Sequence, residues 1–231
     1  MDSDWHPVTV AALFPAADAL TELTLDLHGS PLVGTHRIPG QYVRLSLPRV
    51  GEAHFAIARA PEPGGSRWAF LLKEGSAVPD ALVRLPLGSA VWARTPEGEG
   101  FPLETARGKD LLLFATGSGI SSIHSVIESV RRQRADFGRV TLYFGARTPG
   151  AFAYMNKMSH WEDADIRVVR TVSQPGASGW QGLTGYVQAH IAEEPVENAA
   201  AFVCGQSSMV EGVMEALAQR GLPRERIHLN Y

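Results

Sequence analysis

Two short glycine-containing turns stand where backbone N–H groups could bind a phosphate. Residues 116–120 (Thr-Gly-Ser-Gly-Ile) follow an apolar run and lead into a segment with helical spacing. Residues 204–209 (Cys-Gly-Gln-Ser-Ser-Met) repeat this arrangement further along the chain. Glycines let a backbone approach a phosphate closely, and the first turn of a helix offers unpaired N–H groups with a partial positive charge. Together the two turns indicate a nucleotide site.

Each turn has a purely structural explanation as well. The first is not a Walker loop, because no Gly-Lys-Ser or Gly-Lys-Thr follows, and Ser122 stands where G-x-G-x-x-G has its third glycine. Taken alone, it is explained equally well as a tight strand-to-helix turn. In the second turn Cys204 has the residue type of a small buried hydrophobe, and the serines could cap a helix. The occurrence of both turns at neighbouring strand ends favours the functional interpretation.

The elements that must position these turns alternate strand and helix over the second half of the chain. Apolar runs predict strands at 110–115, 140–144, 166–172, 200–204 and 227–229. Helical spacing predicts helices from residue 120, near 151–160, over 185–192 and around 209–217. This order is typical of a doubly wound parallel α/β sheet, in which ligands bind at the carboxyl ends of the strands.

The first hundred residues instead alternate with a period of two. Leucines occupy every second position from 23 to 27, and apolar residues do the same from 43 to 47. Further short strands are expected at 68–72 and 90–94, with Gly- and Pro-rich turns between them. This pattern predicts an N-terminal antiparallel β-barrel or sandwich. The change of pattern at 98–109 suggests two domains, 1–104 and 105–231.

Composition excludes several classes of protein. The 231 residues are 45% hydrophobic and 19% charged, which is typical of a globular chain, and the net charge of −3 argues against nucleic-acid binding. The single cysteine cannot form an internal disulfide, an iron–sulfur site or a structural zinc site. No apolar run is long enough for a membrane span, and the acidic N-terminus does not resemble a secretory signal. We therefore expect no membrane association and a cytoplasmic location.

No metal site or hydrolytic dyad is expected. The eight histidines lack the spacing of metal ligands. Ser121, His124 and Ser125 lie close together on the first predicted helix, but side chains this close on one helix diverge, and no orienting acid is evident. An arginine-rich run at 131–134 is explained by the negative end of a helix dipole.

The ordered motifs resemble the ferredoxin–NADP reductase superfamily. In the second half the resemblance rests on residues 116–120, on 143–147 (Tyr-Phe-Gly-Ala-Arg) with Tyr154, and on Cys204-Gly205 with Met209. In the first half, residues 38–43 (Ile-Pro-Gly-Gln-Tyr-Val) resemble a strand of the flavin barrel. Residues 74–78 resemble its pyrophosphate turn, and 98–102 the segment that ends the barrel.

The resemblance implies an FAD-dependent NAD(P)H oxidoreductase. NAD(P)H on the second domain would give hydride to the flavin N5, and the flavin would pass electrons to a separate acceptor, including an electron-acceptor protein. Cys204 is the predicted catalytic residue, near the nicotinamide ring. The implied flavin-binding residues are Phe55, Ala56, Ile57, Gly75, Ser76, Ala77 and the stacking aromatic Tyr231. The implied dinucleotide-binding residues are Thr116, Gly117, Ser118, Gly119, Arg147, Ser173, Cys204, Gly205 and Met209.

The chain departs from the family at the flavin strand. The family pattern Arg-x-Tyr-Ser is replaced by Ala-His-Phe-Ala at 53–56, which removes a bidentate phosphate contact. Arg59, or backbone N–H groups at 75–77, would have to bind the phosphates instead. This leaves an alternative open: a non-enzymatic or regulatory module with weakened or lost flavin binding. Where NADP-using relatives have Ser-Arg, this chain has Ser173-Gln174, which favours NAD.

Overall fold

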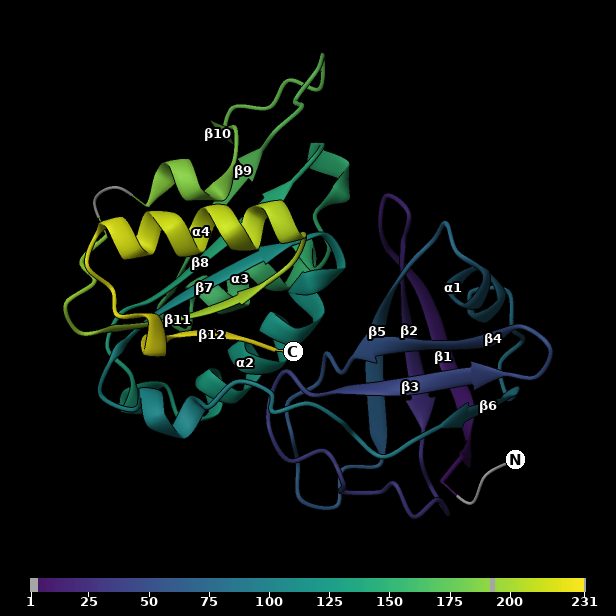
Figure 1. Ribbon diagram of the computed structural model, residues 1–231. Helices are drawn as coiled ribbons and strands as arrows, with labels where there is room; N and C mark the ends of the chain where they lie inside the picture. Colours follow the sequence, from purple (N-terminus) through teal and green to yellow (C-terminus); the bar gives the residue numbers. More distant parts are fainter. Residues whose placement is uncertain (1–3, 192–193, 231) are drawn as a thin grey trace.

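Two sheets lie side by side in the computed structural model, which describes residues 4–191 and 194–230 (Figure 1). The first sheet is antiparallel and has the strand order β4-β3-β6-β1-β2-β5. Its strands are β1 (His6–Ala17), β2 (Leu20–Asp26), β3 (Tyr42–Leu47), β4 (Gly51–Ala56), β5 (Arg67–Lys73) and β6 (Ala90–Ala93). Just after β4, the Ala58 N–H donates to the Ala69 carbonyl on β5 at 2.7 Å, which brings the two ends of the sheet together into a barrel.

Period-two alternation explains how the barrel fills its interior. Val43, Leu45 and Leu47 of β3 point inward and are buried, while the residues between them are only partly covered. Strand β5 is buried on both faces. Trp68 and Phe70 face the barrel interior, whereas Ala69 and Leu71 pack against the core of the second sheet. Burial of β5 on both faces joins the barrel to the rest of the molecule.

The second sheet is parallel, with the strand order β10-β9-β8-β7-β11-β12. Its strands are β7 (Asp110–Thr116), β8 (Val140–Ala146), β9 (Ile166–Val172), β10 (Leu183–Thr184), β11 (Ala199–Cys204) and β12 (Ile227–Leu229). The strand order reverses between β7 and β11, which is where ligands bind in sheets of this kind. Helix α2 (Ile120–Arg132) packs into the core on one face, and α4 (Ser207–Gln219) packs into a separate core on the other.

The remaining helices are short. Helix α1 (Ala77–Leu82) places Val78 and Leu82 in the barrel core, and α3 (Met158–Glu162) contributes Met158 and Trp161 to the core beside α2. Single 3-10 turns occupy Leu103–Ala106, Gly117–Gly119, Arg134–Asp136, Pro149–Ala151, Met155–Lys157, Val187–His190 and Arg224–Arg226. The predicted fold class, an antiparallel barrel followed by a doubly wound parallel sheet, is confirmed. The domain boundary at 104/105 stays a prediction.

Several elements differ from the sequence-based expectation, among them the two-residue strand β10, which was not expected. Strand β1 was not among the expected strands, and its two prolines are of a type that is unfavourable in a strand. The structure accommodates the chain there with register shifts between Val10 and Ala12 and between Pro15 and Ala17. The prediction of a helix over 185–192 was wrong, because the described part of this segment forms the 3-10 turn Val187–His190 and no α-helix. Residue 192 lies outside the described residues. The helix expected near 151–160 is replaced by two 3-10 turns and the short α3.

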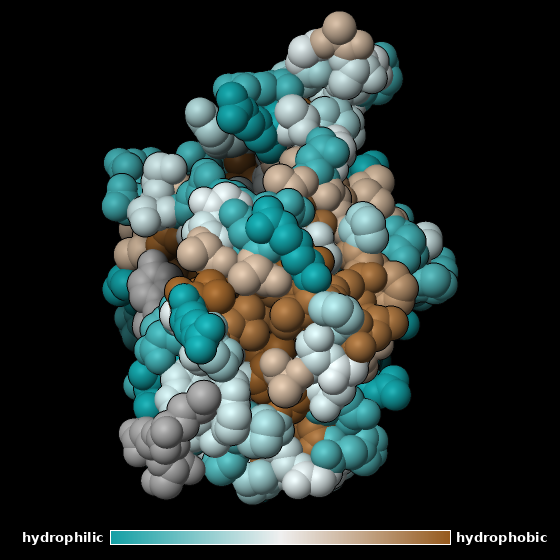
Figure 2. Space-filling view, turned by 90° about the vertical axis from the view of Figure 1, so that its right-hand side faces the viewer, coloured by the Kyte–Doolittle hydropathy of each residue, from teal (hydrophilic) through white to brown (hydrophobic). Residues whose placement is uncertain are grey.

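The outer face of the barrel carries hydrophobic side chains. Figure 2 shows them gathered across the middle of the face that turns away from the parallel sheet. Large apolar side chains of the barrel that remain well exposed include Phe14, Val50 and Leu87. Among the described residues, no helix has the length and apolar character that crossing a membrane requires.

Candidate functional site

Two cavities meet between the barrel and the carboxyl ends of the parallel strands. The first, here called the sheet cavity, has a volume of about 680 Å³, and the second, the barrel cavity, about 570 Å³. Both are lined by Lys73, Thr116, Gly117 and Gln206. Because the two cavities share these walls, ligands that fill both would lie next to each other at these four residues.

The two glycine turns pack directly against each other at this junction. A Cβ atom on Gly119 would lie 2.5 Å from the carbonyl oxygen of Cys204, and one on Gly205 would collide with the side chains of Thr116 and Met209. The Gln206 N–H donates to the Thr116 hydroxyl at 3.1 Å. Close packing therefore requires glycine at both positions, independently of any ligand.

Gly117 has a different reason to be glycine. Its φ is +54°, and nothing lies within 4 Å of the position that a Cβ would take. The 3-10 turn Gly117–Gly119 runs directly into α2, so the first N–H groups of this helical segment lie at the cavities. A helix start of this kind attracts anions through its unpaired N–H groups and its dipole.

Cys204 ends β11 at the wall of the barrel cavity. Burial raises the pKa of its thiol, while hydrogen bonding to Ser122 and Asn230 opposes the shift. The thiol is therefore protonated at neutral pH and is a poor nucleophile. Cys204 can act as a compact neutral wall beside a bound ring, but the structure does not favour covalent chemistry there.

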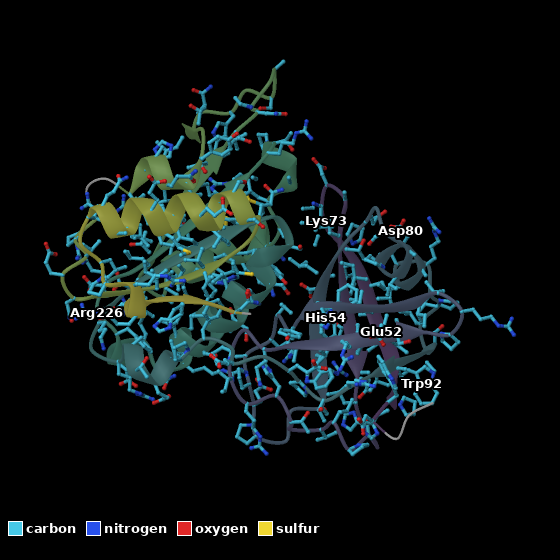
Figure 3. The ribbon with its side chains drawn as sticks, in the orientation of Figure 1. Glu52, His54, Lys73, Asp80, Trp92 and Arg226 are labelled. Carbon is cyan, nitrogen blue, oxygen red and sulfur yellow. The ribbon has the colours of Figure 1, made fainter. Side chains whose placement is uncertain are left out.

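The flavin strand β4 turns two neighbouring rings, Phe55 and His54, to opposite faces. Phe55 is only 7% exposed; it pairs with Val43 and packs edge-on against Phe70, with ring centroids 6.3 Å apart. Its neighbour His54 points to the outer face, where it meets the ring of Tyr42 edge-on at 5.4 Å. Figure 3 shows His54 and Lys73 on the side of the barrel that faces the parallel sheet. Period-two alternation decides this, because residues 54 and 55 cannot share a face.

The expected flavin contacts are only partly brought together. Ala56, Gly75 and Ser76 line the barrel cavity, and Phe55 reaches it despite its burial. Ile57 is fully buried, and neither Ile57 nor Ala77 is among the lining residues. Tyr231 lies outside the described residues.

The phosphate-binding groups proposed for this cavity also differ. The Gly75 N–H donates to the Asp80 carboxylate at 2.8 Å and is therefore already occupied. Arg59 lines a separate cavity beside α2. Lys73 is the lysine that lines both cofactor-sized cavities. Sequence reasoning missed Lys73, although its position at the end of an apolar strand, just before the Glu74-Gly75 turn, was a usable signal.

The sheet cavity contains most of the expected dinucleotide contacts. Its predicted lining residues are Thr116, Gly117, Arg147, Ser173 and Met209, while Ser118, Gly119, Cys204 and Gly205 line the adjoining barrel cavity. The Arg147 Nε donates to the Gln174 side chain at 2.7 Å. Sequence reasoning did not single out Tyr186, Gln188 and Gln206. The buried hydroxyl of Thr171 also lines this cavity and has no hydrogen-bond partner among the residues that the structure describes.

These features fit a dinucleotide in the sheet cavity and a second cofactor with a flat ring in the barrel cavity. The open helix start, Arg147 and the unpartnered Thr171 hydroxyl offer donors to phosphate and sugar. Gly75 leaves the space beside the barrel cavity open, and Lys73 supplies positive charge. Among residues 4–191 and 194–230, no group of three His, Cys, Asp or Glu side chains is placed to hold a metal. Barrel, sheet and paired cavities define a two-cofactor oxidoreductase that combines flavin with nicotinamide nucleotide.

Comparisons with known proteins agree with this class. Residues 113–215 match the family described as the oxidoreductase NAD-binding domain. Ferredoxin–NADP reductase B of Sorangium cellulosum is 33% identical over 206 residues, covering 82% of this chain and 83% of that protein. Sulfhydrogenase 1 subunit gamma of Pyrococcus furiosus is 30% identical, covering 82% of this chain but 66% of that relative. The solved ferredoxin NADP⁺ reductase of Neisseria gonorrhoeae, with bound FAD and NADP, has a TM-score of 0.79 at 17% identity and covers 99% of this chain and 98% of that one.

The chain belongs to the ferredoxin–NADP reductase superfamily of FAD- and NAD(P)H-binding oxidoreductases. The family suggested by the sequence motifs is thereby confirmed, as are the class of enzyme and the two cofactors. The roles of individual site residues, including Cys204, stay predictions.

Proposed function

We propose that this protein oxidises NADH and passes the electrons through FAD to a separate acceptor protein. The observation that carries the proposal is the pair of cavities with shared walls at Lys73, Thr116, Gly117 and Gln206. Hydride transfer needs two rings in contact, and this junction is where a ligand of the sheet cavity meets a ligand of the barrel cavity.

The bound cofactors would supply the redox chemistry, since a reduced nicotinamide donates hydride and a flavin can release electrons one or two at a time. The protein binds and aligns them. Gly117 leaves the space before the start of α2 open to phosphate, and Lys73 adds a charge-assisted contact at the junction. Cys204 limits the space beside the nicotinamide ring. No protein acid or base is required for the hydride step.

NADH is the proposed donor because the chain lacks one arginine where the adenosine ribose of the nucleotide is expected to bind. A 2′-phosphate needs arginine or lysine beside the ribose. Arg147 is present, but its Nε donates to the side chain of Gln174, which stands where NADP-using relatives have the arginine of a Ser-Arg pair. We therefore expect kcat/KM to be higher with NADH than with NADPH.

The acceptor is proposed to be a protein on another chain. The name of one relative supports this, since it is a subunit of a sulfhydrogenase. The proposed location is cytoplasmic, as expected for a chain with one cysteine.

The absorbance spectrum tests the function directly. Protein incubated with FAD and then freed of excess ligand is expected to be yellow, and NADH is expected to bleach it without air. The same measurement with NADPH should give slower bleaching. A protein that remains colourless after FAD addition, yet binds NADH in calorimetry, would contradict the enzyme and support the flavin-free regulatory module.

Lys73→Gln is expected to weaken FAD binding at least about tenfold, because a charge-assisted contact to phosphate contributes about 1.5–3 kcal/mol. The dissociation constant for NADH should also rise, because Lys73 lines both cavities. Quenching of flavin fluorescence measures the first constant and calorimetry the second. Lys109→Gln is the matched control, since Lys109 bonds the Thr105 carbonyl away from the cavities. Equal FAD affinity in the Lys73 and Lys109 variants would rule out this contact.

A further inference from the structure

Helix α2 has two roles that the sequence did not connect. Its preceding turn, Gly117–Gly119, forms walls of the cofactor cavities. One polar face of the same helix then packs against the segment 56–59, which leaves the flavin strand β4. Any shift of this segment relative to α2 changes the distance between the barrel and the sheet cavity.

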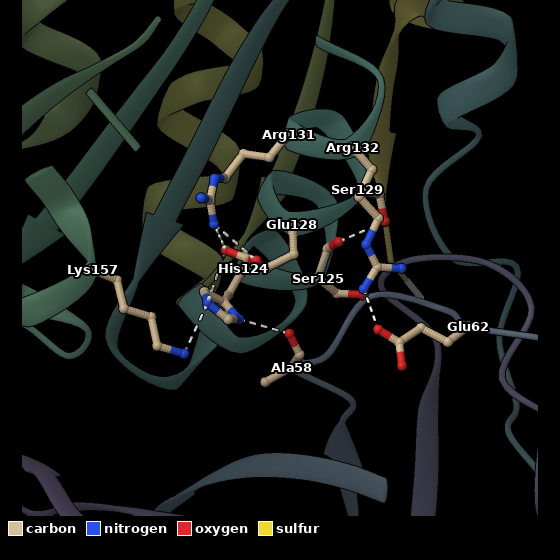
Figure 4. Close-up of polar contacts among 9 residues, drawn as sticks. All are labelled: Ala58, Glu62, His124, Ser125, Glu128, Ser129, Arg131, Arg132 and Lys157. Atoms are coloured by element: carbon tan, nitrogen blue, oxygen red, sulfur yellow. Dashed lines mark hydrogen bonds and ion pairs between the residues drawn. The ribbon is translucent and has the colours of Figure 1, made fainter. Parts of the chain in front are cut away.

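Three buried side chains on this face each bond a backbone carbonyl of the barrel segment. Ser121 Oγ donates to the Ala56 carbonyl at 2.9 Å, and Ser125 Oγ donates to the Arg59 carbonyl at 2.7 Å. Between them, His124 Nδ1 donates to the Ala58 carbonyl at 2.7 Å (Figure 4). Positions 121, 124 and 125 lie on one side of a helix, as the i, i+3 and i+4 spacing requires.

The barrel segment is bonded on its other side as well. The N–H of Ile57 donates to the Gln41 carbonyl at 2.9 Å, and that of Ala58 donates to Ala69 at 2.7 Å. The N–H groups therefore bond the barrel while the carbonyls bond α2. Ser121, His124 and Ser125 are at most 4% exposed, so a side chain that loses its carbonyl partner remains a nearly buried polar group. An unpaired buried polar group costs about 1–3 kcal/mol.

The ring of His124 is held from every side. Because Nδ1 carries the proton given to Ala58, Nε2 accepts from Lys157 Nζ at 3.3 Å. The ring stacks on Tyr154 at a centroid distance of 4.2 Å. Glu128 on the same helix approaches Nε2 to 3.7 Å (Figure 4). This leaves the imidazole a single orientation, directed at the barrel.

We infer that Ser121, His124 and Ser125, here called the α2 latch, set the distance and angle between the two bound rings. They are positioning residues, and the inference rests on the proposed function. Misplacing reacting groups by about 1 Å can cost about a hundredfold in rate. The latch acts within two residues of Gly119 at one end and at Ala56, a wall of the barrel cavity, at the other.

The test uses His124→Phe, Ser125→Ala and the double variant. His124 and Ser125 line neither cofactor cavity, whereas Ser121 does and is left unchanged. Phenylalanine keeps a ring against Tyr154 but cannot bond Ala58. Ser129→Ala is the matched control, because Ser129 is a buried serine of the same helix whose hydroxyl bonds Ser125 inside the helix at 2.8 Å (Figure 4).

Rapid mixing with saturating NADH is expected to show flavin reduction slowed at least about tenfold in the double variant. The dissociation constants of FAD and NADH should change less than about twofold, and the long-wavelength absorbance from stacked nicotinamide and flavin rings should weaken. In the cofactor-free protein, amide hydrogen exchange at Ile57 and Ala58 should accelerate. Ser129→Ala should match the wild type in all four measurements.

Distinct outcomes separate the two ideas. If the wild type takes up no FAD, the proposed function fails and the inference fails with it. If the wild type is reduced by NADH, but the double variant is reduced at the same rate with the same absorbance, the latch inference alone is overturned. It is also overturned if Ser129→Ala slows reduction equally, or if the variants lose only cofactor affinity.

Discussion

Gly119→Ala is expected to lower the free energy of unfolding by about 3 kcal/mol, at the upper end of the usual cost of overpacking. The new methyl group would lie 2.5 Å from the carbonyl oxygen of Cys204, 2.7 Å from its carbonyl carbon and 2.8 Å from the Cα of Gly205. All three atoms belong to the backbone, so no side-chain rotation relieves the clash. The two turns must separate, and NADH binding should be lost with them. Urea unfolding and calorimetry with NADH measure the two effects.

Gly117→Ala separates a clash from backbone strain. At Gly117 no atom lies within 4 Å of the added methyl, but φ is +54°, so alanine there costs about 1–2 kcal/mol. The Gly119 variant should therefore be the less stable of the two. Equal stability of both variants, or NADH binding by Gly119→Ala at wild-type affinity, would show that the two turns can move apart freely.

Acid is expected to destabilise the protein through its buried histidines. Burial lowers the pKa of His124 from 6.5 to about 4; Lys157 and Arg59 act in the same direction, and Glu128 and the Ala58 carbonyl oppose them. Burial likewise lowers the pKa of His36 to about 4. Between pH 6.5 and 4 the unfolded chain binds protons that the folded protein does not, so stability falls as the pH falls through this range.

His124→Asn is expected to remove a large part of this acid sensitivity. Asparagine can still donate to the Ala58 carbonyl but does not titrate. Between pH 7 and pH 4.5 the wild type loses unfolding free energy, and this loss should be about 2–3 kcal/mol smaller in the variant. The figure follows from about 1.4 kcal/mol per pH unit for one proton, over about two units below pH 6.5. Urea unfolding at several pH values measures it. His36→Asn should act separately and in the same direction, whereas a His124→Asn curve parallel to the wild type would refute the assignment.

Local patterns in the sequence were sufficient for most of the architecture. Strands β9 and β12 have the bounds expected from their apolar runs, and the helical spacing that begins at Ile120 is that of α2. Burial of one face imposes a period of two on a strand and 3.6 on a helix, and such periods are visible in the chain itself. The glycines of the two strand-to-helix turns were likewise found from residue type and position alone.

The site was harder to predict, because it depends on which residues meet. Motif alignment placed Phe55 on the flavin, which stays a prediction. The pairing of β3 with β4 turns most of the Phe55 ring towards the core and His54 outward, and both residues line the barrel cavity. The Gly75 N–H was expected to bind phosphate, but Asp80 occupies it. The inward orientation of Phe55 could have been deduced from the apolar alternation of the neighbouring strand, where Val43 pairs with Phe55 and is buried. The contact between Gly75 and Asp80 had no comparable signal in the sequence.

Sequence alone predicted the two-sheet fold and the family, because both depend on local periodicity and short ordered motifs, and the family in turn implied the two cofactors. Only the tertiary structure decided that Lys73 lies at both cavities and that Ser121, His124 and Ser125 join α2 to the flavin strand. The serines and the histidine bond backbone carbonyls about 65 residues away in the chain. Every residue has the same backbone carbonyl, so the sequence contains no signal that indicates which carbonyl these side chains bond.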